Sequence, residues 1–304
     1  MIELACLVCQ SILAVRGETA TCTTCGQTFT QRDGIWRFLS SPRESEFADF
    51  LREYRTVRAD EGWGAVGADY YCALPHVDPD DPQRDIWRIR VSHFQRLLAL
   101  IGDGGPRKIL DAGAGNGWLA HQLARRGHIV AALDLADDPR DGLGASVHYA
   151  THLETYQAEF DRMPFGVGQF DVVIFNAALH YAYALAVTLR EACRVVRSDG
   201  RIIVMDSPFY SRPSSGAAMV AEREASFASK YGFDRQVRTA GFLTQAALGQ
   251  AAAEAGLEIK IGADEGGWVG GWMARLRRAW AERRAGREPA RFPIVVLKRG
   301  NFNA

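Results

Sequence analysis

The feature that most constrains this chain is an alternation of short apolar runs with amphipathic stretches over its last two thirds. The apolar runs, each expected to be a strand, are RKILDAG, HIVAALDL, FDVVIFNA, RIIVMDS, LEIKIG and FPIVVLKR. Helical spacing predicts helices over 118–126, 185–196 and 244–255, a longer one over 83–101, and a helical run near Leu153. Such alternation predicts a parallel sheet with helices on both faces.

Composition excludes several classes of protein. Of 304 residues, 47% are hydrophobic and 24% are charged, which is average for a globular protein and excludes disordered and fibrous classes. The 36 basic and 36 acidic residues cancel, so the whole chain has no net attraction to nucleic acid or to anionic membranes. Without a long apolar window or a basic, apolar leader, the sequence predicts a soluble, cytoplasmic protein.

Four of the six cysteines form two Cys-x2-Cys pairs near the N-terminus, namely Cys6, Cys9, Cys22 and Cys25. Two such pairs joined by a hairpin-length spacer supply four thiolates for one zinc ion, as in a zinc ribbon. The alternative is two disulfides, which would need an oxidising compartment. A segment of this size has little core, so we expect the metal to supply most of its folding free energy, about 10–16 kcal/mol in comparable peptides.

A glycine-rich turn, ILDAGAGNG, occupies residues 109–117 directly after a predicted strand and before a predicted helix. Its glycines permit close approach of a ligand to the backbone, so a nucleotide site is expected at this edge of the sheet. Trp118 replaces the small residue of a dinucleotide fingerprint, and the lysine of a phosphate loop is missing. Asp111 suits a cationic amino-acid group, and Asp134, ending the next strand, suits ribose hydroxyls. The alternative for Asp111 is that it caps the N-terminus of the following helix, and the alternative for Asp134 is that it is an ordinary carboxylate in a turn.

The segment DAGAGNG resembles the first motif of class I S-adenosylmethionine (SAM)-dependent methyltransferases, and the resemblance extends over residues 107–206. AEFDRMPF, FDVVIFNAALHYA and RVVRSDGRIIV are similar to later motifs of that family, of the type found in ubiquinone and menaquinone biosynthesis. The resemblance implies SAM as cofactor. It also implies a Rossmann-like α/β fold with a seven-stranded sheet, the last strand antiparallel, and helices on both faces.

The same resemblance implies a set of cofactor-binding residues. In the family, the residue at the position of Glu159 forms a hydrogen bond with the adenine amino group of SAM, and the residue at the position of Phe160 lies beside the adenine ring. The backbone carbonyl at the position of Asn176 faces the ammonium group of SAM. The whole set is Asp111, Gly113, Ala114, Gly115, Asn116, Gly117, Asp134, Leu135, Glu159, Phe160 and Asn176.

The second cysteine pair continues as CTTCGQTFTQRDGIWRFL, which resembles zinc ribbons that activate tRNA and protein methyltransferases and ribbons fused to some rRNA guanine methyltransferases. The expected organisation is a zinc ribbon over 1–40, a helical and aromatic linker and lid over 41–104, and a SAM-binding domain over 105–304. That domain is expected to carry insertions near 207–243 and 262–292.

The implied reaction moves a methyl group from SAM to an O, N or C nucleophile by in-line displacement. His180, which follows FDVVIFNA, is the candidate general base, and Tyr210, beyond RIIVMDS, is the second candidate catalytic residue. The alternative for His180 is a local hydrogen bond that only shapes the pocket.

A small-molecule acceptor is favoured by the balanced charge and the tyrosine-rich rim. One alternative is RNA, bound by the ribbon and by the basic segment over 266–293, which has three tryptophans and seven arginines. Another is a non-catalytic SAM-binding protein that docks a partner through the ribbon. The sequence does not determine the oligomeric state.

Overall fold

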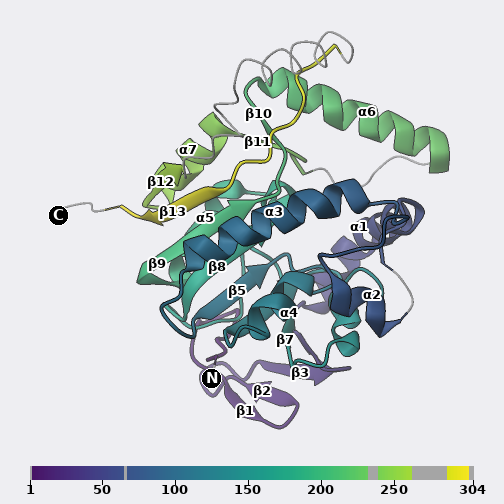
Figure 1. Ribbon diagram of the computed structural model, residues 1–304. Helices are drawn as coiled ribbons and strands as arrows, with labels where there is room; N and C mark the ends of the chain where they lie inside the picture. Colours follow the sequence, from purple (N-terminus) through teal and green to yellow (C-terminus); the bar gives the residue numbers. More distant parts are fainter. Residues whose placement is uncertain (1, 65–66, 232–238, 262–285, 301–304) are drawn as a thin grey trace.

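The computed structural model describes residues 2–64, 67–231, 239–261 and 286–300 (Figure 1). The strands are β1 (Ala14–Arg16), β2 (Thr19–Thr21), β3 (Thr28–Arg32), β4 (Ile35–Arg37), β5 (Lys108–Ala112), β6 (Ile129–Asp134), β7 (Glu154–Gln157), β8 (Phe170–Asn176), β9 (Val196–Met205), β10 (Phe209–Tyr210), β11 (Leu243–Thr244), β12 (Leu257–Ile261) and β13 (Val295–Arg299). The helices are α1 (Ser41–Asp60), α2 (Ala68–Ala73), α3 (Arg84–Ile101), α4 (Trp118–Ala124), α5 (Leu185–Val195), α6 (Pro213–Tyr231) and α7 (Gln245–Glu254), with short 3-10 turns η1 (Leu143–His148) and η2 (Leu179–Tyr181).

The central sheet of the described residues has 11 strands, in the order β1-β2-β3-β4-β7-β6-β5-β8-β9-β13-β12. The expectation of seven strands is therefore wrong. Seven of the strands come from the chain after residue 105, and the other four come from the first 40 residues, because β4 pairs in parallel with β7. The final strand, β13, is antiparallel to β9, as expected.

Both faces of the parallel strands are buried, and alternate residues belong to two different hydrophobic clusters. In β8, Val173 and Phe175 pack on one face, whereas Val172 and Ile174 pack on the other. Helices α5 and α7 cover the first face, and α3 and α4 cover the second. This arrangement explains the near-continuous apolar strands of the sequence.

The four helices predicted from apolar spacing are confirmed to within two residues at each end. The helical run expected near Leu153 is wrong, because β7 begins at the next residue. Leu153 is buried in the second cluster, and the β-branched and aromatic side chains that follow it suit a strand between β4 and β6.

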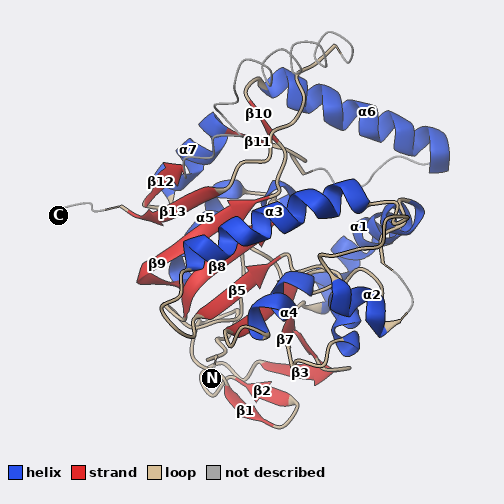
Figure 2. Cartoon of the chain, viewed as in Figure 1, coloured by secondary structure: helices blue, strands red, loops and turns tan. Residues whose placement is uncertain are grey.

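Helix α1 has no clean apolar period in the sequence, yet it forms five turns, with only three of its residues buried. It lies by the carboxyl ends of the sheet strands (Figure 2), and its last residue, Asp60, forms an ion pair with Lys230 near the end of α6. None of the helices in the described ranges is long and apolar enough to cross a membrane.

The N-terminal segment shares the main core instead of forming one of its own. Ile2, Leu4 and Phe38 belong to the same cluster as Tyr156 and Phe165 of the larger domain. The Phe38 ring lies 6.5 Å from that of Tyr156, and the Phe38 N–H donates to the carbonyl of Gln157 at 2.9 Å. The segment and the sheet are therefore expected to unfold together.

We expect Phe38→Ala to lower the free energy of unfolding of the whole chain by about 3–5 kcal/mol, the usual cost of removing a buried phenylalanine ring. Chemical denaturation followed by circular dichroism and tryptophan fluorescence measures it. Val15→Ala on exposed β1 is the control, with a change within about 0.5 kcal/mol. Two separate transitions, of which Phe38→Ala shifts only one, would contradict a shared core.

Candidate active site

A cavity of about 500 Å³ opens where β5, β6, β8 and β9 end. Its floor is formed by the glycine-rich turn after β5 and by the residues that follow β6, β8 and β9. Residues of α1 and α3 close it from above. Carboxyl ends of parallel strands are the usual ligand-binding edge of an open α/β sheet, so this cavity is the candidate active site.

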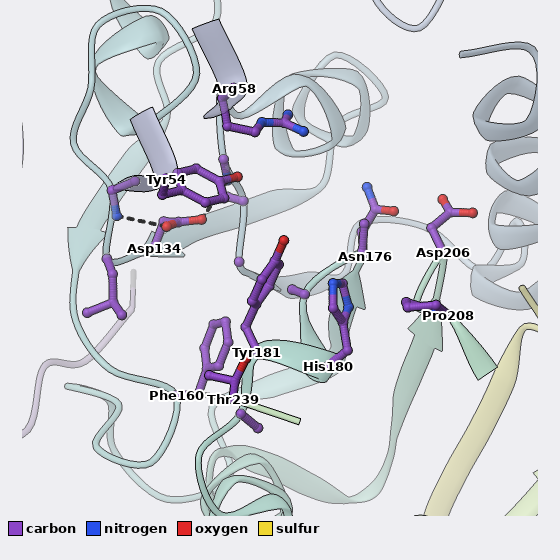
Figure 3. A pocket seen from close by; sticks show the side chains of 18 of the residues that line it. Tyr54, Arg58, Asp134, Phe160, Asn176, His180, Tyr181, Asp206, Pro208 and Thr239 are labelled. Atoms are coloured by element: carbon purple, nitrogen blue, oxygen red, sulfur yellow. Dashed lines mark hydrogen bonds between the residues drawn. The ribbon is translucent and has the colours of Figure 1, made fainter. Parts of the chain in front are cut away.

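Asp134, the last residue of β6, connects the glycine-rich turn to the neighbouring strand. Its Oδ2 accepts the N–H of Gly115 at 2.8 Å, and its Oδ1 accepts the N–H of Ala136 at 2.8 Å. Burial raises the pKa of the Asp134 carboxyl, and these two N–H groups act in the opposite direction. Each oxygen retains a lone pair for a ligand hydroxyl in the cavity (Figure 3).

Gly113 needs to be glycine for two reasons. Its φ of +83° lies in the left-handed region, and a Cβ atom there would lie 2.2 Å from the Cβ of Ala178. The turn can therefore pack directly against the segment that follows β8, which brings the two walls of the cavity together.

Nine of the eleven residues assigned to the cofactor by resemblance line the cavity. They are Gly113, Ala114, Gly115, Asn116, Asp134, Leu135, Glu159, Phe160 and Asn176. Asp111 and Gly117 do not line it. Asp111 is completely buried behind the turn, and Gly117, with a φ of +78°, is the N-cap of α4.

Glu159 is already engaged by a side chain from α1. Arg43 Nε donates to Glu159 Oε1 at 2.9 Å, and a second guanidinium nitrogen contacts the other oxygen. Asp161, two residues further on, also lines the cavity and has its pKa raised by burial and by Glu159. Two carboxyl groups therefore lie at the adenine position that the resemblance assigned to Glu159.

His180 lies at the rim of the cavity but is not a strong base. It is buried, and its Nδ1 lies 3.3 Å from Ser207 Oγ. Burial, reinforced by Arg223, lowers the pKa of His180 to about 3. The imidazole is therefore neutral near pH 7 and accepts protons poorly.

Tyr210 also lines the cavity, and its side chain is almost completely buried. Burial raises the pKa of its phenol, so the hydroxyl keeps its proton at neutral pH. This hydroxyl can therefore serve as a hydrogen-bond donor.

Several cavity residues were missed by sequence reasoning, above all those of α1. The rings of Tyr54 and Tyr181 meet edge to face, with centroids 6.2 Å apart. Arg58 Nη2 donates to Asp141 Oδ1 at 3.1 Å. Figure 3 shows Tyr54 and Arg58 above Asp134, with Tyr181 in the middle of the cavity. Because α1 turns Tyr54 and Arg58 toward a cavity instead of a core, apolar periodicity gives no signal for these two residues.

Asp206 lies just beyond β9, in the same segment as the predicted site residue Tyr210. It has a φ of +55°, in the left-handed region that glycine prefers and that aspartate tolerates better than most residues, and its Oδ1 lies 2.5 Å from His93 Nδ1 of α3. Asn176, His180 and Asp206 lie together on the side of the cavity away from Asp134 and Phe160 (Figure 3).

The four N-terminal cysteines converge as the sequence predicts. All four Sγ atoms lie within 4.8 Å of one another, and three of their separations are 3.4, 3.5 and 3.6 Å. A tetrahedral site with metal–sulfur distances of about 2.3 Å has sulfur–sulfur edges of about 3.8 Å, close to these values. All four are free thiols, so the disulfide alternative is not observed.

The two cysteine pairs have the same backbone conformation. In each pair, the N–H of the first cysteine donates to the backbone carbonyl of the residue five positions later. The carbonyl of the same cysteine accepts the N–H of the residue four positions later. The residue that donates this N–H, Gln10 or Gly26, is left-handed, with φ of 62° and 76°. Paired turns of this kind direct the thiols of both pairs toward one point, as a metal site requires.

The predicted basic segment over 266–293 lies mostly outside the described residues, so its proposed contact with RNA has no structural counterpart here. Of its arginines, Arg287 is described and forms an ion pair with Glu222 of α6 at 2.7 Å.

Comparison with protein families and curated proteins supports a methyltransferase. Residues 110–204 match the family model described as "Methyltransferase domain". Sarcosine/dimethylglycine N-methyltransferase of Halorhodospira halochloris is 35% identical over 148 residues, which are 47% of this chain and 51% of the relative. Malonyl-[acyl-carrier protein] O-methyltransferase of Erwinia pyrifoliae is 30% identical over 36% of this chain and 40% of the relative. The chain thus spans about half or less of these first two relatives.

Two solved structures have the same fold. Geranyl diphosphate methyltransferase in complex with GPP and sinefungin matches with a TM-score of 0.53 and 17% identity, over 84% of this chain and 99% of that one. Geranyl diphosphate C-methyltransferase from Streptomyces coelicolor A3(2), in a complex that includes S-adenosyl-L-homocysteine, matches with a TM-score of 0.51 and 15% identity. This match covers 86% of this chain and 99% of that one. The chain therefore has an α/β methyltransferase fold, and its residues 110–204 match a methyltransferase domain in sequence.

Proposed function

We propose that this chain is a SAM-dependent methyltransferase that transfers a methyl group to an O, N or C nucleophile of a small-molecule acceptor. The observation that carries the proposal is Asp134, which holds the glycine-rich turn through Gly115 and faces the cavity at the carboxyl edge of the sheet. The relatives in sequence include both O- and N-methyltransferases, which supports the reaction class without selecting the acceptor atom.

In this proposal the cofactor lies along the turn. The carboxylate of Asp134 receives the ribose hydroxyls, Phe160 lies beside the adenine, and Glu159 or Asp161 accepts the adenine amino group. The carbonyl of Asn176 faces the ammonium group. All of these residues line the same cavity.

Asp111 is proposed to act from behind the turn as a buried negative charge and not as a direct ligand. Burial and the neighbouring Asp134 raise the pKa of Asp111 to about 7, and the backbone N–H of Ala120 acts in the opposite direction without forming a hydrogen bond of normal geometry to either oxygen. A cationic ligand in the cavity would favour the ionised form of this carboxyl.

The bound cofactor would supply an activated sulfonium methyl group, so the protein mainly has to orient the acceptor and exclude water. We assign His180 and Tyr210 to orientation. His180 is neutral, and the Tyr210 phenol retains its proton, so both can form hydrogen bonds to an acceptor without a change of charge.

Asp134→Asn is expected to weaken binding of S-adenosylhomocysteine at least tenfold, because a carboxylate accepts hydroxyl hydrogen bonds more strongly than an amide does. Isothermal titration calorimetry measures the change. Asp199→Asn, at a side chain that is 80% exposed, is the matched control and should bind like the wild type. Equal affinity in both variants, or no binding by the wild type, would refute the proposed site.

Asp111→Asn is expected to make cofactor-free stability less dependent on pH. The unfolded carboxyl titrates near 4 and the folded one near 7, so the folded state binds more protons between these values and the free energy of unfolding falls as the pH rises. Asparagine does not titrate, so the melting temperature of the Asp111→Asn variant, relative to that of the wild type, should rise from pH 5 to pH 8. A difference that is constant over this range would contradict the buried carboxyl.

We also propose that Cys6, Cys9, Cys22 and Cys25 bind one zinc ion, which would have a structural role. Four thiolates leave no open position for a substrate, and the convergence of the Sγ atoms fits a closed tetrahedral site. Because β4 leads directly into α1, the metal would also stabilise the start of the helix that covers the cavity.

The purified chain is expected to contain one zinc per molecule by atomic emission, and its removal with a strong chelator should lower the melting temperature by more than 10 °C. Cys22→Ser should lose the metal, whereas Cys193→Ser, which changes a cysteine outside the cluster, should retain it. A metal-free chain with an unchanged melting temperature would refute this assignment.

A further inference from the structure

The segment that follows β9 supplies one wall of the cavity and none of the proposed cofactor ligands. Those ligands come from the ends of β5, β6 and β8 and from the segment after β7. Asp206, Pro208 and Tyr210, which follow β9, line the same cavity. Figure 3 shows Asp206 and Pro208 on the same side of the cavity as His180, away from Asp134. Since His180 and Tyr210 are assigned above to the acceptor, this wall is where the acceptor would lie.

Two oxygen atoms at this wall have no hydrogen-bond donor. They are Oδ2 of Asp206 and Oδ1 of Asn176, and both are buried. The two residues lie at the carboxyl ends of neighbouring strands, because Asn176 pairs with Met205 and Asp206 follows directly. Buried acceptors in folded proteins are nearly always paired. Two unpaired ones from residues that line one cavity therefore indicate a ligand with hydrogen-bond donors.

The Asp206 carboxylate is held at one oxygen and unpartnered at the other. Its side chain is 8% exposed, and its Oδ1 lies 2.5 Å from Nδ1 of His93, a buried residue of α3. This contact orients the carboxylate and leaves Oδ2 for a second hydrogen bond. His93 lies behind the cavity lining, so it would act through Asp206 and not on the ligand itself.

The other groups of the cavity that could accept a proton are engaged or unsuited. Within the described residues, four more carboxylates line the cavity, and they belong to the proposed cofactor site or to ion pairs with α1: Asp134, Asp141, Glu159 and Asp161. The low pKa of His180 makes its imidazole a weak base, and the phenol of Tyr210 keeps its proton. Asp206 is therefore the carboxylate that remains for an acceptor.

The ligand group at Asp206 is expected to be a neutral donor and not a cation. Arg90 lies one turn before His93 on α3, and its guanidinium packs 4.9 Å from the centroid of Trp63 and 4.6 Å from that of Trp87. It forms no ion pair in the described part of the chain, and Asp206 acts on it through charge without a hydrogen bond. A second cation at Asp206 would be repelled by Arg90, whereas a hydroxyl group would not be.

The remaining walls suit an aromatic acceptor. Several apolar and aromatic side chains line the same cavity, namely Tyr181, Pro208, Tyr210, Met219 and Phe292. An aromatic ring packs favourably on surfaces of this kind. A hydroxyl group on that ring would supply the donor that the two unpaired oxygens lack.

We propose that Asp206 binds the hydroxyl group of a phenolic acceptor and takes up its proton during methyl transfer, with His93 as its positioning residue. The acceptor oxygen would form a bond to the methyl carbon as the bond from that carbon to sulfur breaks, its electron pair staying on sulfur. The hydroxyl proton passes to Oδ2 of Asp206 and later to water, so the products are an aryl methyl ether and S-adenosylhomocysteine. This inference rests on the proposed function and narrows its nucleophile to oxygen.

The first test measures binding to the full-length, zinc-loaded chain saturated with S-adenosylhomocysteine. The probes are phenol, anisole, which has no hydrogen-bond donor, and benzylamine, which is a cation at pH 7. In NMR titrations, the wild type is expected to bind phenol at least tenfold more tightly than either of the others, because a hydrogen bond to a carboxylate is a strong one. In Asp206→Asn the preference for phenol over anisole should fall below threefold.

The second test measures methyl transfer from SAM in a single turnover at pH 8.5. Asp206→Asn is expected to slow the methylation of phenol about a hundredfold, a usual contribution of a general base. Because 4-nitrophenol is largely ionised at this pH, it has no proton to lose, and the variant should methylate it at least as fast as the wild type does. A merely structural role of Asp206 would slow the methylation of both acceptors alike.

Asp199→Asn is the matched control, because Asp199 lies on the same strand with its side chain 80% exposed, and it should behave like the wild type in both tests. Binding of S-adenosylhomocysteine by Asp206→Asn verifies that this variant folds; if it does not fold, the wild-type preference among the three probes decides.

Four results would each overturn the inference: a wild-type preference for phenol below tenfold, a preference retained in Asp206→Asn, no methylation of phenol by the wild type, or an equal loss of rate for both acceptors in the variant. Failure of the wild type to bind S-adenosylhomocysteine would instead refute the proposed function itself.

Discussion

The parallel pairing of β5 with β6 on one side and β8 on the other is the constraint on which the site depends. Parallel strands end at the same edge, so this pairing brings the glycine-rich turn, Asp134 and Asn176 to one place. Apolar residues on both faces hold the strands between two layers of helices, and the polar groups collect where the strands stop. The cavity is thus a consequence of the sheet's topology, and Gly113 allows the turn to pack directly against Ala178 at one of its walls.

The first 40 residues extend this sheet, and through it they affect the cavity. Strand β4 pairs with β7 in register, Ile35 opposite Thr155, and the chain then continues almost directly into α1. From α1, Arg43 reaches Glu159 and Arg58 reaches Asp141, so two ion pairs fasten the helix over the cavity. The segment that carries the cysteine cluster, the edge of the sheet and helix α1 are therefore joined by strand pairing and ion pairs.

The two halves of the candidate site differ in how far the sequence predicts them. The residues around Asp134 were predicted because they follow consecutive strands in short, recognisable segments. Arg90 and Arg223, which also line the cavity, were not predicted, because they come from α3 and α6, which are distant in the sequence from those segments. His180 was identified correctly as a cavity residue, but its low pKa follows from burial that only packing creates.

By itself, the sequence determined six strands of the larger domain, its helices α3, α4, α5 and α7, the convergence of the four cysteines and most of the glycine-rich turn that lines the cavity. These depend on local periodicity and on short spacings along the chain. Only the tertiary structure decided that the sheet has 11 strands, which residues of α1 line the cavity, and that Arg90 lacks a carboxylate partner while Arg58 has one. These depend on which edges and charges meet in space, which backbone propensity and hydrophobic pattern do not encode.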